Sequence, residues 1–93
     1  MYVNVEIVPN TWTLISDADV LYQVRTGGTV RIWTYEGTTI PTATPSYTSN
    51  EPFWLLSDGS TDTEDFEDRF YETKVGESLW LYSESKTVVV KNT

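Results

Sequence analysis

Carboxylate side chains, which can act as acids and bases, form a cluster in this sequence. The stretch from Asp58 to Asp65 contains four acids, the other two being Asp62 and Glu64. Oxygen ligands at alternating positions can bind a hard cation such as calcium. This stretch departs from the EF-hand pattern, which requires alternating carboxylates, a central glycine and a terminal glutamate. A charge run of this kind is more often a solvated loop, which is the interpretation we favour.

A pair of carboxylates could also hydrolyse a glycosidic bond, with one group acting as the acid and the other as base or nucleophile. The chain has 14 Asp and Glu residues, so some pair will be close by chance. A chain of 93 residues leaves little room for the concave pocket that such an enzyme needs. We therefore expect no catalytic residues and no enzymatic activity.

Other chemistry is restricted because the chain contains no histidine and no cysteine. Ser-His-Asp and Cys-His nucleophile systems cannot be built, and the commonest general base is missing. Disulfides are impossible, and a structural zinc site lacks its usual ligands. We expect neither a metal nor another cofactor.

The net charge of −8 argues against partners that are themselves negatively charged. Nucleic acid and anionic lipid both call for a basic surface, so we expect neither nucleic acid nor a membrane as partner. Ten of the 14 acids lie between Glu51 and Glu84, which predicts an acidic region that could meet a basic partner surface. No signal peptide or membrane-spanning run is evident, so we expect a soluble product made in the cytoplasm.

Alternating aliphatic and aromatic residues predict short β-strands separated by Gly, Pro, Asn, Asp and Ser. One or two helical turns are expected within residues 62–70, where Phe66 and Phe70 are four apart. Residues 38–52 contain three prolines and predict an extended loop or an edge strand. The predicted strands span residues 2–8, 11–16, 20–25, 29–35, 53–56, 71–75, 78–83 and 87–91.

This pattern predicts one domain over residues 1–93, an all-β fold. We expect a small antiparallel β-sandwich or a jelly-roll-like barrel of about eight strands. Gly27-Gly28 predicts a hairpin that joins residues 20–25 to 29–35. A second hairpin is expected about Glu84-Ser85. In residues 11–16, Trp12 and Leu14 are expected to share a face.

Two predicted strands carry aromatic residues where a solvated sheet face would carry polar ones. In residues 29–35 one face is aliphatic and the other holds Arg31, Trp33 and Tyr35; in residues 78–83 the second face holds Trp80 and Tyr82. One interpretation is a two-sided sheet whose second face is covered by the proline-rich segment. The other is an interface with a partner or a second copy, since Trp, Tyr and Arg are enriched at such contacts. These five residues are the candidate partner-binding site.

Two hairpin-like stretches resemble small β-sandwich modules of tailed bacteriophage virions. One runs Val20-Leu21-Tyr22-Gln23-Val24, then a glycine turn and Val30-Arg31-Ile32. The other runs from Gly76 through Leu79-Trp80-Leu81-Tyr82-Ser83 to the valines at 88–90. The resembling proteins are head decoration or cement proteins, head-fibre bases and tail accessory domains. The likeness covers about half of the chain and implies no catalytic residues.

The resemblance implies a structural protein of the virion that binds the major capsid protein or a tail protein as a homo-oligomer such as a trimer. Two alternatives stay open. A carbohydrate-binding module would stack surface Trp and Tyr on sugar rings, and needs Trp33, Tyr35, Trp80 and Tyr82 as a flat exposed platform. An acidic inhibitor that mimics nucleic acid would dock on a basic enzyme.

Overall fold

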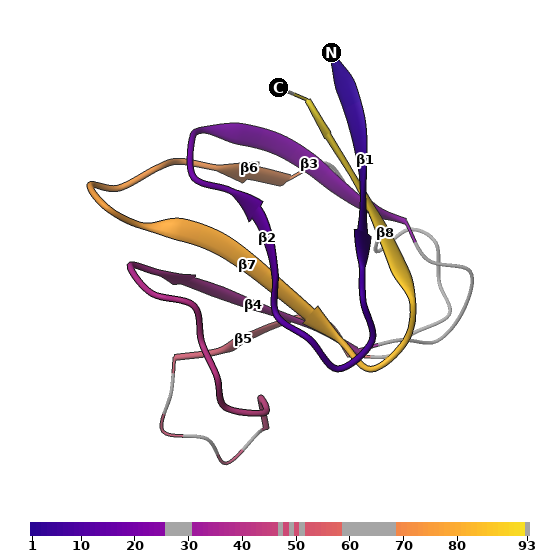
Figure 1. The fold of residues 1–93 in the computed structure, drawn as a ribbon, viewed down its shortest axis with the longest axis vertical. Helices are drawn as coiled ribbons and strands as arrows, with labels where there is room; N and C mark the ends of the chain where they lie inside the picture. The colour runs from indigo at the N-terminus through magenta and orange to yellow at the C-terminus, as the bar shows by residue number, and fades with distance from the viewer. Residues whose placement is uncertain (26–30, 47, 49, 51, 59–68, 93) are drawn as a thin grey trace.

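Two antiparallel sheets make up the computed structural model of the chain (Figure 1). The structure describes residues 1–25, 31–46, 48, 50, 52–58 and 69–92. Over these ranges there is no helix, and hence none long and apolar enough to cross a membrane. The strands found there are β1 (Tyr2–Ile7), β2 (Thr13–Ser16), β3 (Val20–Arg25), β4 (Arg31–Gly37), β5 (Trp54–Asp58), β6 (Arg69–Tyr71), β7 (Ser78–Ser83) and β8 (Thr87–Asn92).

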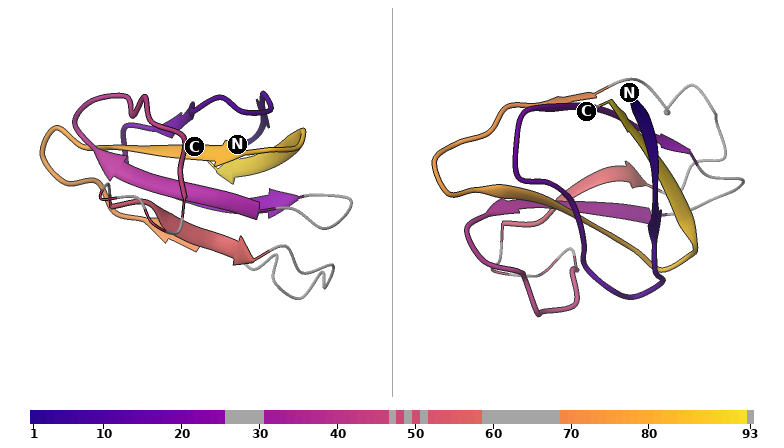
Figure 2. Two further views of the ribbon diagram at one scale, coloured as in Figure 1. Left: turned by 90° about the horizontal axis from the view of Figure 1, so that it is seen from below. Right: turned by 45° about the horizontal axis from the view of Figure 1, so that its top comes forward.

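The strand order is that of a jelly roll. One sheet has the order β1-β8-β3-β6 and the other the order β2-β7-β4-β5, so that β1 pairs with β8, β2 with β7, β3 with β6 and β4 with β5. A long hairpin rolled up on itself produces this pairing in two packed sheets. Figure 2 shows the two layers from two further directions. The expected small antiparallel β-sandwich is confirmed.

Both predicted hairpins are wrong, because consecutive strands cross between the sheets. β3 and β4 lie in different sheets, and the turn about Gly27-Gly28 lies outside the described residues. β7 and β8 also lie in different sheets. Their connection is held as a corner by the buried Thr87 hydroxyl, which donates to Ser83 Oγ at 3.1 Å, while the Ser85 amide donates to the same oxygen at 3.1 Å.

The main core lies between the sheets and is built from alternate residues of the strands. On β3 the three inward positions are buried while Leu21 and Arg25 are exposed, as the alternation predicts. On β1 the fully buried residue is Ile7. The core residues are Ile7, Ile15, Val20, Tyr22, Val24, Ile32, Tyr71, Leu79, Leu81 and Val89.

Three local predictions need correction. Leu14 does not share a buried face with Trp12: it is 44% exposed and Ile15 enters the core, because the pairing with β7 shifts between Leu14 and Ser16. The strand expected at residues 71–75 is instead β6, which ends at Tyr71. Of the expected helical turns, residues 62–68 lie outside the described ranges, and Phe70 belongs to β6 because it pairs with β3.

Candidate functional site

A second, aromatic core lies on the outer face of the β2-β7-β4-β5 sheet. Trp33 and Tyr82 are directly paired across β4 and β7, and both are buried, with 5% and 6% of their surface exposed. The buried Trp12 ring lies 5.3 Å from the Tyr82 ring and 5.0 Å from that of Phe53, between centroids. The partly buried residues packed around this cluster are Tyr35, Phe53, Leu55 and Trp80.

The long connection between β4 and β5 contributes the cover of this aromatic core. The Trp12 indole N–H donates to the Ala43 carbonyl at 3.0 Å, Pro45 is buried, and Phe53 packs edge-on against Tyr35 with centroids 5.8 Å apart. Figure 1 shows this connection leaving the sheet after β4 and returning to it at β5. Trp33 and Tyr82 therefore lie on a sheet face that is covered by the proline-rich segment, which was the first of the two interpretations.

The five predicted partner-binding residues lie on the adjacent strands β4 and β7. Tyr35 is paired with Trp80, and Trp33 with Tyr82, so the four aromatics do come together. Only Arg31 is exposed, whereas Tyr35 and Trp80 are half-buried. The four aromatics therefore do not form the flat exposed platform that the carbohydrate-binding alternative needed. The Trp80 indole nitrogen is buried and has no hydrogen-bond acceptor among the described residues.

Large apolar side chains are exposed on all four edge strands of the two sheets. The exposed fractions are 75% for Tyr2 on β1, 44% for Leu14 on β2, 72% for Trp54 on β5 and 64% for Phe70 on β6. Sequence reasoning missed these residues as a set, because a strand becomes an edge only when the pairing is known. The available signal was an apolar residue at an outward position of a short strand.

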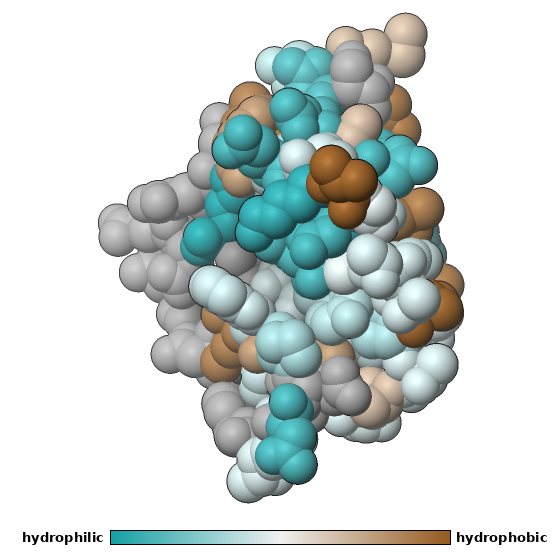
Figure 3. All heavy atoms as spheres, turned by 90° about the vertical axis from the view of Figure 1, so that its left-hand side faces the viewer, coloured by the Kyte–Doolittle hydropathy of each residue, from teal (hydrophilic) through white to brown (hydrophobic). Residues whose placement is uncertain are grey.

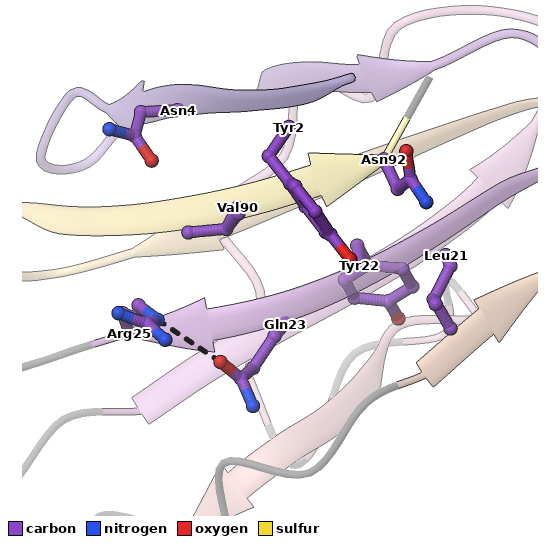
Figure 4. A pocket seen from close by; sticks show the side chains of 8 residues that line it. All are labelled: Tyr2, Asn4, Leu21, Tyr22, Gln23, Arg25, Val90 and Asn92. Carbon is purple, nitrogen blue, oxygen red and sulfur yellow. Dashed lines mark hydrogen bonds between the residues drawn. The ribbon is translucent and has the colours of Figure 1, made fainter.

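A groove of about 500 Å³ lies on the outer face of the β1-β8-β3-β6 sheet. Figure 4 shows its lining side chains projecting from β1, β8 and β3. Arg25 Nε donates to Gln23 Oε1 at 3.0 Å within this groove. The lining residues are Tyr2, Asn4, Leu21, Tyr22, Gln23, Arg25, Val90 and Asn92.

Acidic side chains gather where the β2–β3 and β6–β7 turns meet. Asp19 Oδ1 accepts a 2.6 Å hydrogen bond from the Thr73 amide and so joins the two turns. Hydrophilic side chains gather in the upper half of the side of the molecule that carries the β6–β7 turn, around one apolar side chain (Figure 3). Of the acidic stretch 58–65, residues 59–65 lie outside the described ranges. No group of three potential metal ligands occurs over the described residues.

Two buried tyrosines have shifted acidities. Burial raises the pKa of Tyr71, and the negative charges of Glu36, Glu77 and Asp19 raise it further. Burial also raises the pKa of Tyr22, although nearby Arg69 opposes the shift. The Tyr71 hydroxyl has no hydrogen-bond partner among the described residues. Both phenols are therefore neutral members of the core at physiological pH.

No family model, curated protein or solved structure matches this chain. The fold and the surface together define the molecule as a small jelly-roll domain. It has one sheet face covered by its own chain, one face open as a groove, and apolar side chains along its edges.

Proposed function

We propose that this chain is a non-enzymatic structural protein of a bacteriophage virion, of the capsid decoration or cement type. It binds the capsid or tail surface as a homo-oligomer. It is made in the host cytoplasm and resides on the particle. No cofactor takes part.

The observation that carries the proposal is the exposed apolar side chain on every edge strand. Proteins that stay monomeric protect sheet edges with charges, prolines or covering segments, since bare edges attract other chains. Here Trp54 and Tyr2 are the large residues most exposed at the edges, at 72% and 75%. Trp and Tyr are the side chains enriched at interface contacts. A symmetric oligomer seated on a larger surface would cover the edges of the β2-β7-β4-β5 sheet, where Leu14 and Trp54 are exposed, and would leave the outer face of the other sheet open.

Two further observations support the same assignment. Jelly rolls are common among viral capsid domains, although this is an analogy of fold. Residues 20–24 and 76–83 resemble modules of tailed-phage virions. The first stretch lies in β3, and the second comprises the end of the β6–β7 turn and β7. The acidic region at the β2–β3 and β6–β7 turns would suit a basic patch on the particle.

The carbohydrate-binding alternative loses its original platform, since Trp33 and Tyr82 are buried. The acidic-inhibitor alternative is supported by the net charge of −8 and by the acidic side chains at the β2–β3 and β6–β7 turns. The acidic-inhibitor alternative gives no role to the apolar side chains on the edge strands.

A binding assay on particles tests the proposal. Purified chain is mixed with virions that lack it, the particles are pelleted, and the bound fraction is measured against free chain. We expect saturable binding that Trp54→Ser lowers at least severalfold. Val75→Ser is the matched control, because Val75 is fully exposed on the β6–β7 turn and belongs to no edge strand. Absence of binding by the unmodified chain would refute the proposal.

A further inference from the structure

We propose that the groove on the outer face of the β1-β8-β3-β6 sheet binds a neutral oligosaccharide. This activity goes beyond attachment to a particle, because the groove lies on a sheet face and is formed within one chain. Its residues differ from the five that the sequence singled out.

The groove is formed by the regular pairing of three strands. β8 lies between β1 and β3, so Tyr2, Asn92 and Leu21 form one row across the face, and Asn4, Val90 and Gln23 form the next. Residues paired in this way point to the same side of the sheet. The volume of about 500 Å³ lies in the range of small-ligand sites. The backbone therefore fixes the spacing of the side chains before any ligand arrives.

The aromatic part of the groove suits the apolar face of a sugar ring. The Tyr2 ring is 75% exposed, and Figure 4 shows it lying across the groove. Its hydroxyl has no hydrogen-bond partner in the described part of the chain. Phe70 is paired with Leu21 at the far end of the same row and is 64% exposed. A chain of sugar units would meet an aromatic ring at either end of that row.

The polar part of the groove suits vicinal hydroxyl groups, which both donate and accept hydrogen bonds. Asn4, Gln23 and Asn92 each combine an amide donor with a carbonyl acceptor, and Arg25 adds donors. Two of these groups are already oriented: Asn92 Oδ1 accepts from the N-terminal ammonium at 3.1 Å, and Gln23 Oε1 accepts from Arg25. The side-chain amide of Asn4 has no hydrogen-bond partner among the described residues.

Charge selects a neutral ligand. Among the described residues that line the groove, none has a carboxylate side chain, and Arg25 is the one with a charged side chain. The whole chain carries a net charge of −8, which repels anionic polymers such as nucleic acid or acidic polysaccharide. A peptide strand would be expected to add to a sheet edge, where backbone groups are free, rather than to a face.

Titration by two-dimensional ¹H–¹⁵N NMR tests the proposal with the intact chain. The probes are neutral hexasaccharides of glucose, galactose, mannose and N-acetylglucosamine. At least one should shift the amides of the groove strands saturably. Tyr2→Ala should weaken binding about two- to tenfold, the loss expected for one aromatic contact. Tyr2→Phe, which keeps the ring, should stay within about twofold of the unmodified chain.

Asn4→Ala should weaken the same titration, whereas Val75→Ala on the β6–β7 turn should leave it unchanged. Well-dispersed spectra of each variant show that the fold is intact. The proposal is overturned if none of the four sugars shifts the groove amides. It is also overturned if Tyr2→Ala and Asn4→Ala bind sugar as tightly as the unmodified chain does. A third contrary result is that the groove amides shift with protein concentration and not with sugar, which would identify a second copy of the chain as the occupant. None of these results would affect particle binding measured with Trp54→Ser.

Discussion

The indole N–H of Trp12 donates a hydrogen bond to the carbonyl oxygen of Ala43 at 3.0 Å, although the two residues are 31 positions apart. Trp12 immediately precedes β2, and Ala43 lies in the connection between β4 and β5. The bond fixes that connection over the ring cluster that contains Tyr82 and Phe53. One side chain thus helps to close a sheet face that would otherwise expose aromatic rings.

Replacing Trp12 by Phe tests this closure. The substitution keeps an aromatic ring but removes the indole donor. We expect a loss of at least about 0.5–1.5 kcal/mol in the free energy of unfolding, the net contribution of one hydrogen bond. The smaller ring adds to this loss because it fills less of the buried cluster. Urea denaturation measures it. Trp54→Phe is the control and should change stability by less than about 0.5 kcal/mol, since Trp54 is 72% exposed. Equal losses in both variants would contradict the role of Trp12.

Trp33 and Trp54 should separate folding from assembly. Trp33→Ala should destabilise the chain by about 3–5 kcal/mol, because it leaves a cavity in a buried cluster. Trp54→Ala should leave stability nearly unchanged and shift the association equilibrium toward monomer. Urea denaturation and sedimentation velocity give the two readings. A chain that sediments as a monomer at every concentration would refute the proposed homo-oligomer.

Alkaline pH should destabilise the fold through its buried phenols. Burial raises the pKa of Tyr71 and Tyr22 above the unfolded value of about 10. Above that pH the unfolded chain releases these protons first, so stability is present below about pH 10 and falls as pH rises through the folded pKa values. Tyr71→Phe should reduce this fall. It should also cost little at neutral pH, because the hydroxyl has no partner among the described residues.

The urea midpoint of the unmodified chain and of Tyr71→Phe, followed from neutral pH to about pH 11, measures the effect. Tyr2→Phe, which removes one hydroxyl from an exposed ring, is the matched control. A parallel decline in all three proteins would show that the Tyr71 phenol is not responsible.

Gly37→Ala should destabilise the end of β4. A methyl group at this position would collide with the ring of Tyr35. We expect a cost of about 1–3 kcal/mol, typical of overpacking. The same substitution made together with Tyr35→Ala should cost clearly less, because the colliding ring is gone. A double-mutant cycle by urea denaturation measures the coupling, and additive costs would show that Tyr35 is not the obstacle.

The fold class followed from local patterns, whereas the strand pairing did not. The alternation in residues 20–25 and 78–83 predicted β3 and β7 with their bounds. Turn signals such as Gly27-Gly28 favour hairpins between neighbours in sequence, but the first strand pairs with the last, Tyr2 opposite Asn92. Such pairing is decided by which aliphatic faces can be buried together, and that information is spread over the whole chain.

In the candidate sites too, local patterns could be predicted from the sequence and contacts between distant segments could not. Alternation brought Trp33 and Tyr82 to one face, as predicted, but their cover depends on Trp12 meeting Ala43. No spacing in the sequence indicates that contact. The groove was missed because its residues come from β1, β3 and β8 and meet only once the jelly roll has closed.

The location of the chain after infection shows whether it is a structural protein of the virion. Lysate from cells in which a phage expresses this gene is separated on a density gradient, and the chain is quantified by mass spectrometry against the major capsid protein. We expect the chain to band with the virions at a fixed ratio to the capsid or tail protein that it binds. Recovery of the chain only among free proteins, with none on the particles, would contradict it.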